Sequence, residues 1–293
     1  MIRHSLLALG CALAAASAAT LAGSAWAEAT PAGTQYVAMG SSYASGPGLP
    51  DIINQACMRS AQNYPHQVAA ATGLRVVDVS CSGAITANIL NRPQHTRRGA
   101  VMPPQIAAVT TDTRLVTVSI GGNDLNLVGS MLTDSSCAKI TGSMPRLCEH
   151  LTGHRPPTAA AIATVERSIT TVISMVRARA PHATVMLIQY LPAFDKSATT
   201  CAAAPMPASE AATVRQTYDD LFHATGRVAA QTGATVISVP DAEAHTACSA
   251  DPWVAGYVGP PTAGHAAIRA GAFHPNLEGT TRIAQQIIAR LRH

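Results

Sequence analysis

The chain contains five short runs of mainly apolar residues, separated by longer stretches that alternate between helical and irregular character. Short apolar runs that end in glycine or small polar residues are typical of fully buried strands. The runs cover residues 36–39, 74–79, 115–120, 184–190 and 235–239. Helices are expected at residues 64–71, 84–90, 105–110, 158–179, 209–231 and 276–291. This alternation predicts an α/β fold, a three-layer α/β/α sandwich with a five-stranded parallel sheet covered on both faces.

Three long segments, residues 133–157, 191–207 and 240–273, show neither a helical nor a strand pattern. All three leave from the C-terminal side of predicted strands, so they should rim one edge of the sheet. Long ordered loops in a compact domain are more often functional than short ones. Ligands in open α/β sheets bind outside the carboxyl ends of the strands. The pattern therefore predicts a functional site at this edge.

The composition fits one large aliphatic core, because 47% of the 293 residues are hydrophobic and 12% are charged. We expect a single domain that covers residues 28–293 and is a monomer. The net charge of +4 is spread along the chain, without a Lys/Arg run interleaved with aromatic residues. Nucleic acid is therefore not an expected partner.

Residues 1–27 have the features of a secretory signal peptide. A positively charged start precedes the apolar run 6–21, and Ala25 and Ala27 supply small residues at the −3 and −1 positions of a cleavage site. No later stretch is judged long and apolar enough to span a bilayer, so no stable membrane anchor is expected. The mature protein should be soluble and secreted, to the extracellular space or the periplasm.

Six cysteines remain after the signal peptide is removed, an even number that favours three disulfides in an oxidising compartment. They are Cys57, Cys81, Cys137, Cys148, Cys201 and Cys248. Six cysteines allow fifteen pairings, and their positions do not select one. A zinc site is the alternative, but the chain has no C-x-x-C pair. His150 and His154 are four residues apart, but Gly153 and Pro156 argue against a helix there, so we expect a surface loop and no metal site.

Small polar residues follow the first three predicted strands, at the edge where a site is expected. They are Ser41 and Ser42, then Ser82 and Gly83, then Gly122 and Asn123. A serine hydroxyl at such an edge could attack an acyl carbonyl if a base removes its proton. The reaction also needs hydrogen-bond donors for the developing oxyanion. The backbone N–H groups of Ser42 and Gly83 and the side-chain amide of Asn123 are the candidates.

His274 is the candidate base. Pro275, which follows it, suits the first position of the last predicted helix and restrains the preceding residue to an extended conformation. The imidazole of His274 should therefore project from a stiff segment of backbone.

These residues resemble the four sequence blocks of the SGNH hydrolases, also called GDSL-type esterases and lipases. The matching segments are Gly40-Ser41-Ser42-Tyr43, Gly83 within Ser80-Cys81-Ser82-Gly83-Ala84, Gly121-Gly122-Asn123-Asp124 and His274-Pro275-Asn276. The resemblance implies the flavodoxin-like fold of the family, Ser42 as nucleophile, His274 as base, and Ser42, Gly83 and Asn123 as the oxyanion hole. It implies chemistry without a metal or cofactor.

The six cysteines and Asn63-Tyr64-Pro65-His66 resemble a secreted bacterial esterase and lipase subgroup of this family. That subgroup implies sequential disulfides, Cys57 with Cys81, Cys137 with Cys148, and Cys201 with Cys248.

Two positions depart from the family pattern. Ser41 stands where an Asp usually precedes the nucleophile, and Gly271 stands where an Asp usually lies three residues before the histidine. We therefore predict a Ser42–His274 dyad whose imidazole is oriented by a backbone carbonyl, with Gly271 as its source and Asp241 as the reserve candidate. Asp124 is expected to cap and orient its loop, because a carboxylate beside an oxyanion hole would oppose the developing charge.

The sequence thus predicts a secreted serine esterase or lipase that hydrolyses carboxylic esters of small molecules or lipids through an acyl-enzyme. The alternatives are a polysaccharide deacetylase or a phospholipase of the same fold, or a binding protein that has lost the chemistry. An apolar acyl pocket is expected around Leu125, Leu127, Trp253 and Phe273.

Overall fold

The protein was analysed as a computed structural model that describes residues 33–140, 148, 152–258 and 270–292. Its centre is a five-stranded sheet in the order β4-β1-β7-β8-β9, and every neighbouring pair is parallel. The strands are β1 (Gln35–Gly40), β4 (Arg75–Asp78), β7 (Thr113–Ser119), β8 (Thr184–Ile188) and β9 (Thr235–Ile237). The predicted parallel sheet is confirmed. The predicted signal peptide lies outside the described residues.

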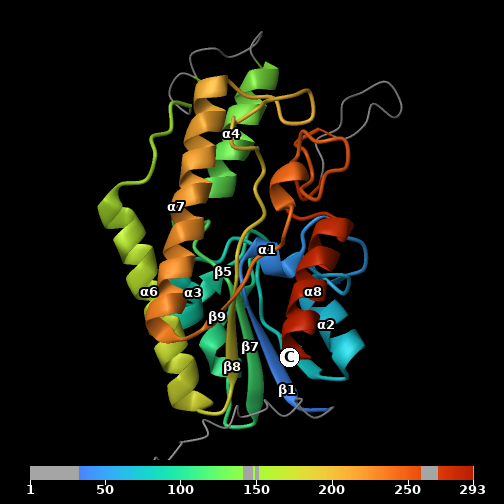
Figure 1. The fold of residues 1–293 in the computed structure, drawn as a ribbon, viewed down its shortest axis with the longest axis vertical. Coiled ribbons are helices and arrows are strands. Elements are labelled where there is room, and N and C mark those ends of the chain that lie inside the picture. Colours follow the sequence, from blue (N-terminus) through green and yellow to red (C-terminus); the bar gives the residue numbers. More distant parts are fainter. Residues whose placement is uncertain (1–32, 141–147, 149–151, 259–269, 293) are drawn as a thin grey trace, which may run out of the picture.

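Helices cover both faces of the sheet, which confirms the three-layer prediction. In Figure 1, α2 and α8 lie on one side of the sheet, while α3, α6 and α7 lie on the other. Their bounds are α2 (Tyr64–Thr72), α3 (Thr86–Leu90), α6 (Ala159–Arg179), α7 (Ala208–Thr232) and α8 (Leu277–Leu291). Side-chain caps start three of them: Asn63 accepts from the His66 N–H of α2, Thr158 from the Ala161 N–H of α6, and Asn276 from the Gly279 N–H of α8.

The helix α4 (Leu127–Ile140) corrects the prediction that residues 133–157 are wholly irregular. Its polar side chains do not break the helix, because Thr133 and Ser136 donate to the carbonyls four residues earlier, at Gly129 and Leu132. Leu127, Val128 and Met131 of α4 are buried, whereas Leu132 is exposed. Figure 1 shows α4 beside α7, beyond the carboxyl ends of the strands.

The sequence did not predict several short elements. They are α1 (Ser42–Ser45), the hairpin β2 (Ile52–Asn54) and β3 (Arg59–Ser60), the hairpin β5 (Gln94–His95) and β6 (Val101–Met102), and the 3₁₀ turn η2 (Ala242–Ala244). The helical segment expected at 105–110 is the 3₁₀ turn η1 (Gln105–Ala108).

The expectation that no later segment could span a bilayer needs correction for α6. By length and composition, α6 is apolar enough to cross a membrane. In the fold, however, it is an amphipathic helix whose buried residues, Ile162, Val165, Ile169, Val172, Ile173 and Val176, recur at helical spacing. Its outer face carries Arg167 and Thr171.

Three disulfides join Cys57 to Cys81, Cys137 to Cys148 and Cys201 to Cys248. This confirms the sequential pairing that the family resemblance implied. The first bridge ties the β2–β3 hairpin to the loop after β4, and the second ties α4 to the segment that precedes α6.

Candidate active site

The turn that follows β1 holds Ser42 at the carboxyl edge of the sheet. Gly40 closes β1 against β7 so tightly that a Cβ atom there would lie 2.5 Å from the Ser119 carbonyl oxygen. The Gln105 side chain fixes the same peptide, because its Oε1 accepts from the Gly40 N–H at 2.7 Å and its Nε2 donates to the Gly40 carbonyl at 2.9 Å. Ser42 is the first residue of α1, so its N–H is not used by that helix's own hydrogen bonds.

The two adjacent serines have different surroundings. The Ser41 hydroxyl is 2.8 Å from the Tyr190 hydroxyl, and Ser41 is only 1% exposed. The Tyr190 ring in turn packs against Gly122, where a Cβ atom would meet it at 2.8 Å. Ser41 therefore links the loop after β1, through Tyr190, to the loop after β7. Ser42 is 6% exposed and remains the candidate nucleophile.

The structure brings His274 to the turn that carries Ser42. The ring of Tyr43, the residue after Ser42, has its centroid 5.5 Å from that of His274. The Tyr43 hydroxyl also donates to the Phe273 carbonyl at 2.9 Å. Backbone hydrogen bonds from Ala255 to His274 and from Phe273 to Ala255, both 2.8 Å, hold the segment in place. His274 is thus fixed by its backbone on both sides.

The His274 imidazole is oriented by a backbone carbonyl, but the acceptor is Ala272 rather than the predicted Gly271. Nδ1 lies 2.8 Å from the Ala272 carbonyl oxygen, whereas the Gly271 carbonyl accepts from the His274 backbone N–H at 2.9 Å. Both carbonyls are brought under the histidine by the tight turn at Gly271, with φ +75°, and Phe273, with φ +60°. The reserve candidate Asp241 is exposed.

The Ala272 carbonyl fixes the protonation pattern of the imidazole. A carbonyl oxygen can only accept, so Nδ1 carries the proton and the lone pair is on Nε2. Nε2 is buried and has no hydrogen-bond partner in the described part of the chain, so the Ser42–His274 hydrogen bond is not formed in this structure. Such bonds often tighten only when substrate binds. Burial lowers the pKa of His274 to about 4, against the smaller opposing effects of the Ala272 and Gly271 carbonyls.

The remaining candidate residues lie on the loops that flank Ser42. Because the strand order is β4-β1-β7, Gly83 after β4 and Asn123 after β7 lie on either side of it. Gly83 has φ +84°, which favours glycine, and a Cβ atom there would meet only the Gln94 side chain at 3.6 Å. The space beside Gly83 therefore admits a close substrate. The Asn123 amide donates to the Ala84 carbonyl at 2.8 Å, which ties the two loops and leaves its second N–H hydrogen.

The expected role of Asp124 is confirmed. Its carboxylate accepts from the Thr86 N–H at 3.1 Å and from the Thr86 hydroxyl at 2.6 Å, at the start of α3. This carboxylate holds the loop after β7 against α3.

The expected acyl pocket is only partly present. A cavity of about 10 Å³, the room of one water molecule, lies beside Tyr43. Of the four residues expected there, only Leu127 lines it; α4 and α7 supply Met131, Val214 and Tyr218. Trp253 instead stacks on His245 with ring centroids 3.8 Å apart, and Phe273 is fully buried.

The site residues that the sequence missed are Tyr43, Tyr190 and Gln105. Each acts through contacts with distant segments. Tyr43 lies within the first block, but the block does not indicate its contact with the Phe273 carbonyl, and no local motif marks Tyr190 or Gln105.

Comparison with known proteins identifies the family of the chain. A family model described as the GDSL-like Lipase/Acylhydrolase family matches residues 38–282. Lipase 2 of Streptomyces coelicolor is 34% identical over 285 residues, covering 95% of this chain and 90% of that protein. A lipase of Streptomyces rimosus is 32% identical over 231 residues, covering 75% of this chain and 76% of that protein.

Two solved structures share the fold. The extracellular lipase of Streptomyces rimosus has a TM-score of 0.63 at 28% identity, covering 88% of this chain and 98% of that one. Phospholipase A1 of Streptomyces albidoflavus has a TM-score of 0.65 at 26% identity, covering 89% of this chain and all of that one. The chain therefore belongs to the GDSL-like lipase/acylhydrolase family and is a carboxylic ester hydrolase.

Proposed function

We propose that the protein is a secreted lipase that hydrolyses lipid esters through an acyl-enzyme on Ser42, with His274 as the base. The observation that carries this proposal is the unpartnered, lone-pair-bearing Nε2 of His274, held beside the Ser42 turn by the Ala272 carbonyl. Acyl transfer requires a base with a free lone pair that can reach the nucleophilic hydroxyl.

In the proposed mechanism, the Ser42 Oγ attacks the ester carbonyl while His274 Nε2 takes its proton. The oxyanion that forms is stabilised by the N–H groups of Ser42 and Gly83 and by the Asn123 amide. The imidazolium then donates its proton to the leaving alcohol, and a water molecule activated by the same Nε2 releases the acid.

The lipid class of the substrate is inferred from the relatives, which are described as lipases. Phospholipase A1 activity is the second candidate, since the phospholipase of S. albidoflavus shares the fold over its whole length. Comparing hydrolysis of triacylglycerol and of phosphatidylcholine by the purified protein would distinguish the two. Preference for an acetylated polysaccharide over both would contradict the lipid assignment.

Secretion is supported by the three disulfides, which form and persist in oxidising compartments. N-terminal sequencing of the protein recovered from the culture medium or periplasm should begin at Glu28. Recovery of the uncleaved chain from the cytoplasm would contradict this.

The nucleophile is tested by comparing Ser42→Ala with its neighbour, Ser41→Ala. A fluorophosphonate probe should label the wild type and Ser41→Ala covalently, and it should not label Ser42→Ala. Hydrolysis of p-nitrophenyl esters should fall by at least about 10³-fold in Ser42→Ala. Labelling of Ser42→Ala would refute the proposal, and absence of labelling in the wild type would favour a binding protein.

A further inference from the structure

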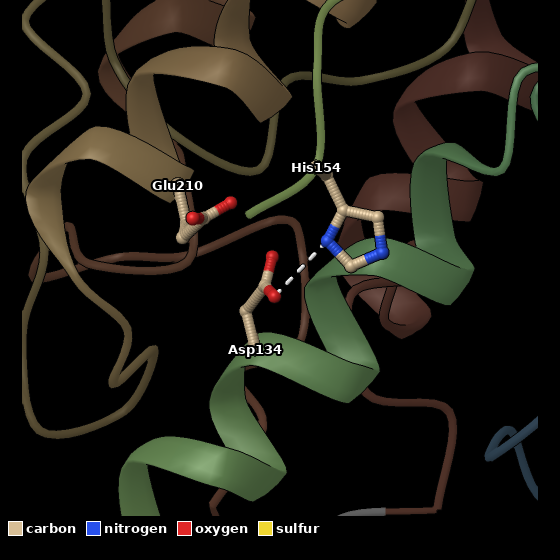
Figure 2. Close-up of side chains that lie close together, drawn as sticks. All are labelled: Asp134, His154 and Glu210. Carbon is tan, nitrogen blue, oxygen red and sulfur yellow. Dashed lines mark hydrogen bonds and ion pairs between the residues drawn. The ribbon is translucent and has the colours of Figure 1, made fainter. Parts of the chain in front are cut away.

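Three side chains that commonly bind metals meet at one point outside the candidate active site. Asp134 comes from α4, Glu210 from the first turn of α7, and His154 from the segment that precedes α6. One ligand atom from each lies within 4.8 Å of the other two. Figure 2 shows the three side chains directed toward one another, with the His154 Nδ1 3.1 Å from the Asp134 Oδ1.

The two carboxylates are buried and only partly satisfied. Asp134 is 0% exposed and Glu210 is 9% exposed. The Asp134 Oδ2 and the Glu210 Oε2 have no hydrogen-bond partner within the described ranges, although the other Glu210 oxygen accepts from the Gly153 N–H at 3.0 Å. A buried anionic oxygen without a partner is energetically costly, and such groups usually pair with a cation or coordinate a metal.

We propose that Asp134, His154 and Glu210 form a binding site for a divalent transition-metal cation, with Zn²⁺ the best match. One imidazole nitrogen and two carboxylate oxygens form a ligand set that Zn²⁺ accepts, whereas Ca²⁺ and Mg²⁺ prefer oxygen ligands alone. Ligand atoms of a tetrahedral zinc ion lie about 3–3.5 Å apart. The Asp134–His154 pair already has this spacing, and the Glu210 carboxylate, within 4.8 Å of both, would complete the set by a small rotation of its side chain.

The His154 side chain is 25% exposed, so solvent reaches the cluster and a water molecule can serve as the fourth ligand. A cation held at Nδ1 would take the place of a proton in the His154–Asp134 contact, because a coordinating nitrogen must offer its lone pair. This site was not expected from the sequence, which predicted no metal site and a surface loop at His154.

The position of the cluster suggests what the cation does. Asp134 follows Met131 on α4 by three residues, and Glu210 precedes Val214 on α7 by four, so each lies about one helical turn away. Met131 and Val214 both line the cavity beside Tyr43. The Cys137–Cys148 disulfide lies about one turn beyond Asp134 on α4, and Cys148 precedes His154 by six residues in the sequence. A bound cation would therefore fix the two helices that wall this cavity.

The test uses the whole secreted protein, freed of metal with a chelator and then titrated with Zn²⁺. Elemental analysis after gel filtration should find one zinc per chain, and Co²⁺ should give the visible absorption of a low-symmetry site. Saturating Zn²⁺, at about 100-fold over Kd, should raise the Tm by about 5–10 °C. Equal concentrations of Ca²⁺ or Mg²⁺ should have little effect.

The variants Glu210→Gln and His154→Ala should both lose the stoichiometric zinc and the Tm shift. His182→Ala, which removes an exposed histidine elsewhere, should keep both. Circular dichroism and ester hydrolysis verify that each variant is folded. Zinc retained by His154→Ala, a Ca²⁺ shift as large as the Zn²⁺ shift, or a wild type without Co²⁺ absorption would overturn the proposal.

Discussion

The pH dependence of hydrolysis offers a direct test of the buried His274. Burial lowers the pKa of this imidazole to about 4, and a general base acts only in its neutral form. With an ordinary pKa near 6.5, only about 9% of the base would be neutral at pH 5.5. With a pKa of about 4, about 97% is neutral at that pH. We therefore expect kcat/KM to be about tenfold higher at pH 5.5 than an ordinary histidine would allow.

The measurement is kcat/KM for an uncharged p-nitrophenyl ester between pH 3.5 and 8, since this ratio reports the pKa of the free enzyme. It should be flat down to about pH 5 and then fall tenfold per pH unit below about 4. Circular dichroism at each pH shows whether the protein is still folded. An inflection at pH 6.5 or above in folded protein would refute the argument from burial.

The same pKa predicts how stability depends on pH. Because the pKa of His274 is lower in the folded protein than in the unfolded chain, the unfolded chain binds more protons between about pH 4 and 6.5. The free energy of unfolding therefore keeps its full value above about pH 6.5. It falls by about 3 kcal/mol in all as the pH is lowered to about 4. In His274→Asn this part of the pH dependence of urea unfolding should disappear.

Two substitutions test the backbone and the charge network that support the site. Gly271→Asp restores the residue usual in the family, but it should lower both stability, by about 2 kcal/mol or more, and kcat/KM. The reason is that φ at Gly271 is +75° and a Cβ atom there would lie 2.0 Å from the Pro47 carbonyl oxygen. A free energy of urea unfolding and a kcat/KM at or above those of the wild type would contradict this. Arg215→Leu removes a buried guanidinium that bonds the Phe194 carbonyl and two carboxylates. Because those carboxylates are about 40% exposed, the loss in urea unfolding should be about 2–3 kcal/mol, below that of a fully buried pair; a loss under 1 kcal/mol would show that water replaces Arg215.

The sheet and the positions of the four family sequence blocks could be predicted because both are marked by local sequence patterns. Each strand is a short apolar run, the first three runs are followed by glycine or serine, and in a parallel sheet such ends meet at one edge. Ser42, Gly83 and Asn123 follow three of these strands, so the sequence predicted that they lie on one edge. Only the fold shows that the three strands are also neighbours, in the order β4-β1-β7. His274 was found because His274-Pro275-Asn276 resembles the last family block. Pro275 was expected at the first position of the last helix, but that helix begins at Leu277 with Asn276 as its N-cap.

The features that were missed depend on contacts between distant segments. The part of α4 from residue 133 onward has the polar residues of a loop, such as Thr133 and Ser136, so the sequence predicts an irregular segment there. Only the fold shows that these two hydroxyls donate to backbone carbonyls of the helix itself. The cluster of Asp134, His154 and Glu210 joins residues that are far apart in the sequence. His154 lies 20 positions after Asp134, and Glu210 lies 56 positions after His154. The carbonyl acceptor at Ala272 could not be separated from Gly271, because the choice depends on backbone torsions at Gly271 and Phe273.

The lost aspartate has a structural explanation that also constrains the proposed mechanism. Gly271 packs directly on the backbone at Pro47 and Gly48, so no side chain fits at the position where the family usually places the carboxylate. The Ala272 carbonyl can set the tautomer of His274, but as a neutral dipole it stabilises the imidazolium less than a carboxylate does. Proton transfer to a base of lowered pKa is then uphill. In the proposed mechanism more of the catalysis must come from the oxyanion donors, each worth about 3–4 kcal/mol, which explains why the Gly83 and Asn123 loops are tied so firmly to each other and to α3.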